Sequence, residues 1–489
     1  MEYKWEAFSV TSIGSLMAAV DSTVVILALL PIAKDLNSDF VTMVWVVVAY
    51  LLANTALVLS LGRVSDLHGR KKMYNIGFVV FTVGSALSGL APTGYVLVVF
   101  RALQGVGAAM LTANSFAILS EAFPPRERGK AFGANSILWG IGSTVGIVIG
   151  GVIIAFASWR WIFLINVPIG IFGTYWAYRT LKEVKNPASS QSFDLPAAVV
   201  FTLGLFSFIY GVTSGLLYSW TSLGTLLSLA ATPGFIAFFI LWEIRYSRSP
   251  IIDFSVFRNL GFTFPVVSAL LQSLALFSVN FLLIFYLEGI GGFSVLTASY
   301  LLIPMAVGAA VVGPIGGVLS DRMGPRLIAS AGLAIQVGAL LSLSQLTVST
   351  PLTYIGIAEG LYGVGGGLFW PANTSTIMAA TQPGKYGVGS GIMNTFRNTG
   401  MVLSFALSLT AVTSVIPSYV AYSLFVGDVN GKLSPVYASG YLSGQRFALE
   451  LSAVLVLVSL LFATSRRKNE VARVVTSVPA SGAPVRRRD

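Results

Sequence analysis

The chain has 489 residues, of which 55% are hydrophobic and only 10% are charged, and its mean hydropathy is +0.81. Soluble domains carry roughly 25% charged residues, so this composition excludes an ordinary soluble protein and indicates an integral membrane protein. The chain has no cysteine and one histidine, which excludes disulfides, thiolate metal sites and multi-histidine metal clusters. The formal net charge is +11.

Apolar windows long enough to cross a bilayer recur along the whole chain, since a spanning helix needs about 20 mainly apolar residues. They predict helices at 9–30, 43–62, 74–92, 96–119, 130–156, 160–179, 195–215, 222–244, 260–284, 296–319, 327–347, 352–379, 387–412 and 446–465. The first window has no cleavage-site pattern and is expected to be a retained helix. Fourteen spans would place both termini on one side of the membrane.

The basic residues indicate which side that is. Loops after the even-numbered predicted helices, together with the two tails, hold most of the Lys and Arg residues. The opposite loops hold only Lys34, Arg160, Lys432 and Arg446. Cytoplasmic loops carry such an excess, so both termini are expected in the cytoplasm and the protein in the cell (plasma or inner) membrane. The positive charge is therefore topological, and nucleic acid is not an expected partner.

The sequence contains an internal repeat. Four pairs of sites match in the same order at nearly constant spacing: GRVSDLHGR (62–70) with GVLSDRMGPR (317–326), RALQGVG (101–107) with EGLYGVG (359–365), Gly133 with Gly391, and Gly142 with Gly400. The spacing exceeds six helices and their loops, so two further helices must lie between the repeats. Parallel repeats of this kind are a transporter architecture.

The predicted fold is therefore all-α, with two six-helix pseudo-repeat bundles and two inserted helices. The expected parts are an N-terminal bundle at 1–185, the inserted helices at 186–250, a C-terminal bundle at 251–465, and a basic cytoplasmic tail at 466–489. The tail is polar and contains Pro and Ser, so it is expected to be disordered.

Several stretches resemble the major facilitator superfamily. GRVSDLHGRKK resembles its motif A and RALQGVGAAM its motif B, while AVDSTVVILALLPIA, SWRWIFLINVPIG and PIIDFSVFRN resemble signatures of its fourteen-helix drug:proton antiporter branch. The resemblance spans all but the tail and implies a transporter, not an enzyme, that uses a proton gradient and no cofactor. One departure is Ile147, which replaces the motif C proline in GIGSTVGIVIGG. Four glycines that permit close helix packing remain, namely Gly142, Gly146, Gly150 and Gly151.

Three ionisable residues fall inside predicted helices and are candidates for proton coupling. Asp21 lies near the middle of the first helix, Arg101 two turns into the fourth, and Glu359 two turns into the twelfth. Intramembrane ionisable groups are functional candidates by default, and burial favours the neutral form of an acid. A nearby Arg101 could switch the charge of Asp21, and the resemblance assigns the motif B arginine to proton coupling. A purely structural ion pair or brace is the alternative for each residue.

The resemblance implies a cytoplasmic gate at motif A. Asp66 would pair with Arg70 and meet the positive N-terminal dipole of a helix from the other half, while Gly62 and Gly69 permit close packing and a tight turn. The second-half counterparts are Asp321, Gly324 and Arg326, where Pro325 interrupts the basic run. His68 is expected to be a solvated loop residue.

Polar and aromatic residues on the predicted helices could line a central cavity or serve ordinary helix packing. The cavity candidates are Gln104, Asn135, Trp139, Asn394 and Arg397, and residues of similar character are Asn54, Trp370 and Asn373. Arg397 is expected to be either a structural partner or an anion contact. Glu288 and Glu450 lie near helix ends and are expected to be solvated.

The leading hypothesis is a monomeric exporter that exchanges protons for an amphipathic cationic or neutral small molecule by rocking of the two bundles. Its partners would be the small-molecule substrate, protons and the lipid bilayer. A proton symporter or facilitator for a nutrient or organic anion is the alternative, and a non-transporting sensor is a third class. No GxxxxGK[ST] motif occurs, which argues against an ATP-driven pump.

Overall fold

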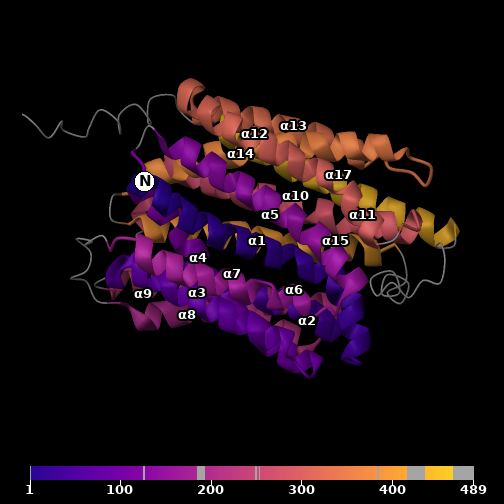
Figure 1. The fold of residues 1–489 in the computed structure, drawn as a ribbon, viewed down its shortest axis with the longest axis horizontal. Helices are drawn as coiled ribbons and strands as arrows, with labels where there is room; N and C mark the ends of the chain where they lie inside the picture. The colour runs from indigo at the N-terminus through magenta and orange to yellow at the C-terminus, as the bar shows by residue number, and fades with distance from the viewer. Residues whose placement is uncertain are drawn as a thin grey trace, which may run out of the picture.

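The structure is a computed structural model that describes residues 2–124, 127–183, 193–247, 250–252, 254–293, 295–382, 385–415 and 435–465. Every regular element in these ranges is helical, and the helices run side by side along the long axis of the molecule (Figure 1). The predicted all-α fold is confirmed. The predicted tail at 466–489 lies outside the described residues.

The first half of the chain forms long helices that end at turn residues. They are α1 (Tyr3–Asp35), α2 (Phe40–His68), α3 (Arg70–Gly89), α4 (Gly94–Ala122) and α5 (Arg128–Phe156), followed by the short α6 (Trp161–Leu164) and α7 (Asn166–Thr180). The side chain of Asp39 caps α2 by accepting a 3.1 Å hydrogen bond from the Thr42 amide. Such caps satisfy amides that have no partner within the helix.

Two helices separate the halves, and the second half follows. The middle pair is α8 (Leu195–Leu217) and α9 (Leu223–Arg245). The second half comprises a 3-10 helix η3 (Phe254–Arg258), α10 (Leu260–Phe285), a π-helical turn η4 (Tyr286–Ile290), α11 (Val295–Leu301), α12 (Ile303–Met323), α13 (Pro325–Leu343), α14 (Leu352–Ala380), α15 (Tyr386–Thr413) and α17 (Pro435–Thr464). The side chain of Asp194 caps α8 through the Ala197 amide at 3.0 Å.

Ten helices in the part of the chain that the structure describes are long and apolar enough to cross a membrane. The last helix begins at Pro435, whereas the sequence predicted a start near 446. The prediction was late because the first turns (PVYASGYLSGQ) contain Ser, Gly and Gln and fall below the hydropathy expected of a span. The first helix begins at Tyr3, whereas the sequence predicted a start near residue 9. Lys4 and Glu6 lower the hydropathy of its first turn, so the apolar window did not include it.

The two halves meet along several pairs of helices. Within the first half α4 packs on α2 and α3, and α1 packs on α5; within the second, α14 packs on α12 and α13, and α10 on α15 and α17. Between the halves, α5 contacts α12 and α2 contacts α15. The α2–α15 contact is backbone-close, since a Cβ on Gly391 would lie 3.0 Å from the Leu59 Cα.

The helices α8 and α9 contact helices of both halves of the chain. The helices α8 and α9 pack on each other, and α8 also contacts α2 and α15. Phe239 of α9 shares a buried apolar cluster with Leu59 of α2 and Ile392 of α15. The hydroxyl of Thr202 in α8 donates to the Ala56 carbonyl of α2 at 3.3 Å. The helices α8 and α9 therefore pack where α2 of the first half meets α15 of the second half.

Candidate functional site

A polar cluster centred on Asp21 lies inside the first bundle. Asp21 on α1 has no exposed surface, and its Oδ2 accepts from Arg101 Nη1 of α4 at 2.6 Å. Its Oδ1 accepts from Gln104 Nε2 at 2.8 Å and from Asn166 Nδ2 at 3.2 Å. Removing two charges from water is costly unless the geometry is good and the remaining lone pairs are satisfied. Both conditions hold here, because Arg101 pairs with the acid and both carboxylate oxygens accept hydrogen bonds.

Arg101 is fixed by groups other than the acid. Its Nε donates to the Val46 carbonyl at 3.2 Å and its Nη1 also donates to Gln104 Oε1 at 2.7 Å. The guanidinium carbon lies 4.3 Å from the centre of the Tyr50 ring, a cation–π arrangement. Gln104 therefore bridges base and acid. The structure shows the predicted pairing of Asp21 with Arg101. Gln104, a candidate either for the cavity lining or for helix packing, contacts both members of this pair.

Sequence reasoning missed Asn166 and Tyr50. Asn166 opens α7 and also donates to Ser85 Oγ at 3.1 Å, which joins α7 to α3. In the sequence it stands out as an amide side chain within the apolar stretch WIFLINVPIG, and in the structure it is fully buried. Tyr50 lies close enough to Asp21, Arg101 and Arg397 to interact electrostatically with all three. It thus stands between the charged cluster of one bundle and a cation of the other.

Glu359 on α14 stands in a very different environment from Asp21. It has no exposed surface, and neither of its carboxylate oxygens has a hydrogen-bond partner among the described residues. It lies one turn before Tyr362 and two turns before Gly366, on the face of α14 that continues into the cavity described below. An ionised carboxylate would be uncompensated here, and a bound proton would remove that charge.

Motif A joins the two bundles at one end of the molecule. Arg70 donates to Asp66 Oδ1 through Nη2 at 2.6 Å and Nε at 3.1 Å, and it also contacts Glu121 through Nη1. The other oxygen of Asp66 accepts from the Val388 amide of α15 at 3.1 Å. Val388 lies in the first turn of α15, where amides lack helical partners and the dipole attracts an anion.

The turn glycines of the two motif copies share one conformation. Gly69 has φ +102° and Gly324 has φ +93°, a region that glycine enters without steric cost. Gly62 is buried, and its carbonyl accepts from Ser65 Oγ at 3.1 Å. Asp321 and Arg326 are both exposed, in contrast with the buried Asp66 and Arg70. The two copies therefore agree in backbone and differ in packing. His68 is exposed, as predicted, but it is the last residue of α2 and not a loop residue.

A second contact between the bundles lies one to two turns along α15. The side chain of Asn394 and the hydroxyl of Ser390 both donate to the Thr112 carbonyl of α4, at 3.3 and 3.4 Å. The Thr112 hydroxyl in turn donates to Asn54 Oδ1 of α2 at 3.3 Å. Asn394 and Asn54 therefore lie at the interface between the halves, on the motif A side of the cavity, instead of in its lining.

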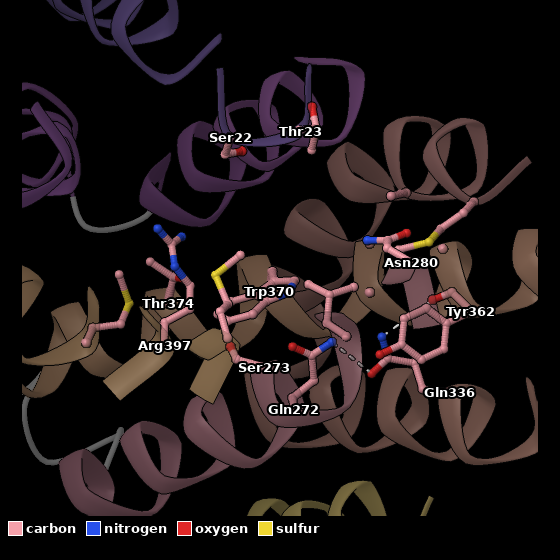
Figure 2. A pocket seen from close by; sticks show the side chains of 18 of the residues that line it. Ser22, Thr23, Gln272, Ser273, Asn280, Gln336, Tyr362, Trp370, Thr374 and Arg397 are labelled. Carbon is pink, nitrogen blue, oxygen red and sulfur yellow. Dashed lines mark hydrogen bonds between the residues drawn. The ribbon is translucent and has the colours of Figure 1, made fainter. Parts of the chain in front are cut away.

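A cavity of about 160 Å³ lies between the halves (Figure 2). Its lining consists of Ser22, Thr23, Phe116, Gln272, Ser273, Leu276, Asn280, Met305, Ala309, Gln336, Tyr362, Gly363, Gly366, Gly367, Trp370, Thr374, Met393, Arg397 and Met401. Only the first three belong to the first half. Of the predicted cavity candidates Arg397 lines it, and so does Trp370, whose ring centre lies 6.0 Å from the guanidinium carbon.

The other predicted residues lie elsewhere. Asn135 is buried, and neither of its amide atoms has a partner within the described ranges. Asn373 donates from α14 to the Pro265 carbonyl of α10 at 2.9 Å, and Glu450 is exposed. The side chains of Trp139 and Glu288 lie outside what the structure describes.

The cavity contains polar residues that the sequence did not single out. Gln272 Nε2 donates to Gln336 Oε1 at 3.4 Å, and Gln336 Nε2 donates to the Tyr362 carbonyl at 3.4 Å. The Tyr362 hydroxyl, Ser273 Oγ and Gln272 Oε1 are buried and have no hydrogen-bond partner among the described residues. Buried polar atoms normally have partners, so these are available to a ligand or water. In the sequence, Gln272 and Gln336 could have been noticed as glutamines within otherwise apolar helices.

The motif C glycines lie where α5 meets α1. A Cβ on Gly142 would be 2.8 Å from the Ala19 Cβ, and one on Gly146 would be 2.8 Å from the Val20 carbonyl oxygen. Gly150 and Gly151 are buried as well. The close helix approach predicted for the first two therefore occurs against the helix that carries Asp21.

Comparisons with known proteins identify the family of this chain. The profile of the Major Facilitator Superfamily matches residues 11–405. The chain belongs to the major facilitator superfamily. The riboflavin transporter RibZ of Clostridioides difficile is 32% identical over 426 residues, which cover 87% of this chain and 90% of RibZ. Multidrug resistance protein 3 of Bacillus subtilis is 31% identical over 82% of this chain and 78% of its own length.

A solved structure shares this fold. The human organic anion transporter MFSD10 (TETRAN) superimposes with a TM-score of 0.65 at 13% identity, covering 94% of this chain and 99% of that one. Further relatives are named as multidrug resistance proteins, among them Stp of Mycobacterium tuberculosis. This chain is a multi-pass membrane transporter and not an enzyme.

Proposed function

We propose that this chain exports amphipathic small molecules in exchange for protons by alternating access, crossing the cell membrane fourteen times with both termini in the cytoplasm. The two six-helix bundles would rock about the cavity, and α8 and α9 would be the inserted pair. The observation that carries the proposal is that Asp21, buried in its ion pair, directly precedes Ser22 and Thr23, which line the cavity. One turn of α1 thus presents a titratable acid to one side and a cargo surface to the other.

Proton binding would act through the Asp21 cluster. A proton on Asp21 removes the charge that Arg101 now neutralises, so the guanidinium must find another anion or water. That cost changes the balance between two arrangements of α1 and α4. Tyr50, which interacts with Arg101 and with Arg397, offers a route by which cargo in the cavity is felt at the proton site. Glu359 would be a second proton carrier in the other bundle.

Motif A would set which side of the membrane is open. The bond from Val388 to Asp66 and the bonds from Ser390 and Asn394 to Thr112 all cross between bundles at the predicted cytoplasmic end. These bonds would hold that end closed. Because these bonds break when the bundles separate, they stabilise the outward-facing arrangement.

The direct test is gradient-driven transport in proteoliposomes. Export should depend on an imposed pH gradient, and adding cargo should release protons. Asp21→Asn should abolish gradient dependence while cargo binding persists. Asp35→Asn is a matched control, since Asp35 ends the same helix and pairs with Arg160 outside the cluster. Transport by Asp21→Asn at the wild-type rate and gradient dependence would refute the proton role of Asp21.

Uptake by proton symport or facilitated entry, of a nutrient or organic anion, is the second candidate. The observation that favours it is a cationic cavity residue, Arg397. Right-side-out and inverted vesicles distinguish the two directions. When the medium is more acidic than the vesicle interior, a symporter accumulates cargo in right-side-out vesicles, whereas an exporter depletes them of cargo.

A further inference from the structure

The cavity carries one kind of charge. Among its described lining residues the only side chain with a formal charge is Arg397, and no Asp or Glu belongs to the lining. Two acids lie close in sequence to lining residues, but one is paired with other side chains and the other lies outside the lining. Asp21 is saturated by Arg101, Gln104 and Asn166, and Glu359 lies one turn beyond the lining on α14.

This arrangement disfavours a cationic cargo. A permanent cation would enter a low-dielectric space beside a guanidinium and without a carboxylate to neutralise it. An anion would gain a charge-assisted contact with the same guanidinium, and Arg is suited to carboxylate and similar planar acids. Of the cationic or neutral cargo expected from the sequence, the sign of the cavity therefore disfavours the cationic kind.

The rest of the lining describes the body of the ligand. Trp370 and Phe116 offer aromatic faces, and Met393 and Met401 are flexible apolar contacts next to Arg397 on α15. In Figure 2, Trp370 lies between Arg397 and Tyr362. Trp370 and Tyr362 are two turns apart on α14, roughly 12 Å along the helix. This is room for a fused aromatic ring system.

The far end of the cavity is polar but uncharged. The Tyr362 hydroxyl, Ser273 Oγ and Gln272 Oε1 are each fully buried and have no hydrogen-bond partner among the described residues. They supply two hydroxyls and an amide oxygen to whatever occupies that end. A cargo with a neutral hydrogen-bonding group there would satisfy atoms that otherwise remain unpaired.

We infer that the cargo is an aromatic organic acid, carried with its anionic group at Arg397, its ring system against Trp370, and a neutral hydrogen-bonding group at Tyr362, Ser273 and Gln272. The inference rests on the transport function proposed above and narrows its cargo from amphipathic compounds in general. It holds for either direction of transport, because the charge of the cavity does not depend on which gradient is used.

The test uses three probes of one shape that differ in charge: naphthoate, naphthamide and naphthyl-trimethylammonium. Binding to the purified full chain is measured by thermal shift and by quenching of tryptophan fluorescence, and movement is measured in proteoliposomes with a pH gradient. Naphthoate should bind at least about tenfold more tightly than the trimethylammonium probe, with naphthamide between them, as expected for one charge-assisted contact.

Substitutions assign the preference to one residue. Arg397→Gln should remove the preference for naphthoate over naphthamide, and Arg397→Lys should retain part of it because the charge remains. Arg446→Gln removes one positive charge from exposed α17, outside the lining, and should leave the preference intact. The lysine variant keeps the test valid if the glutamine variant does not fold.

Four results would overturn the inference: tighter binding of the cation, equal binding of all three probes, a preference that survives Arg397→Gln, or no binding of any probe. Failure of the transport function is distinct from these. If naphthoate binds preferentially but no gradient moves any probe, transport fails and the charge preference stands. If the gradient moves only the cation, transport stands and the inference fails.

Discussion

Replacing Asp66 by Asn should open the motif A end of the molecule. The substitution keeps the shape of the side chain, and its amide oxygen can still accept from Val388, while its amide nitrogen then faces Arg70 and cannot accept from it. The Arg70 contact lies within one bundle and is present whichever side is open, so its loss largely cancels between the two arrangements. What remains is the attraction between a carboxylate and the N-terminus of α15. Because Asp66 is only 1% exposed, this attraction should reach about 2 kcal/mol. That energy corresponds to a shift of roughly thirtyfold in the ratio of closed to open arrangements.

The shift can be measured through an introduced thiol, since the chain has no cysteine. Ser390→Cys places one at the α15–α4 contact, where the native side chain has no exposed surface. A membrane-impermeant maleimide applied to inverted vesicles should react with it several-fold to thirtyfold faster when Asp66→Asn is also present. Asp35→Asn, which removes an acid at the opposite end, should leave the rate unchanged. If Asp66→Asn labels at the rate of the unsubstituted background, the contact with α15 does not hold this end closed and the gate role is refuted.

Three further outcomes follow from the same structure. Asp21→Asn should leave Arg101 without its counter-charge and so lower thermal stability by about 3–5 kcal/mol in addition to uncoupling transport, and an unchanged melting temperature would show that the ion pair contributes little. Gly146→Val should destabilise the chain by about 1–3 kcal/mol through overpacking against α1, as seen in thermal unfolding, whereas a neutral effect would mean that α5 can move away. The Asp35 pKa lies below its ordinary value because Arg160 and a tryptophan N–H donate to the carboxylate, so its stabilising contribution is present at neutral pH and is lost as pH falls through the lowered pKa. The stability difference between wild type and Asp35→Asn, below about 1 kcal/mol for such a half-exposed pair, should therefore vanish in acid, and persistence of the difference there would contradict the ionic explanation.

The helices could be located from the sequence because bilayer-crossing segments are long, apolar and bounded by turns. The repeat of GRVSDLHGR also predicted a shared local structure, and Gly69 and Gly324 have nearly the same φ. What the repeat could not predict is that Asp66 is buried against α15 while Asp321 is exposed. Local conformation follows local sequence, whereas burial depends on how the bundles approach each other.

The site was predictable only in part, for a physical reason. The pairing of Asp21 with Arg101 followed from the cost of isolated charges in a membrane, which leaves few possible partners. For Gln104 the sequence left cavity lining and helix packing both open, because its character as a polar residue on α4 does not reveal which helix it faces. Tyr362 and Gln272 were missed since their role depends on unpaired atoms, and pairing is visible only once neighbouring helices are placed.

The unequal lining of the cavity bears on how such a protein can diversify. The first half contributes Ser22, Thr23 and Phe116, and the second half contributes everything else. Substitutions at most lining positions therefore leave the Asp21 cluster intact. A lineage could acquire a new cargo through mutations in the second half alone while it inherits the Asp21 cluster, the proposed proton site, unchanged. Directed evolution of cargo range should accordingly concentrate its libraries on α10, α14 and α15.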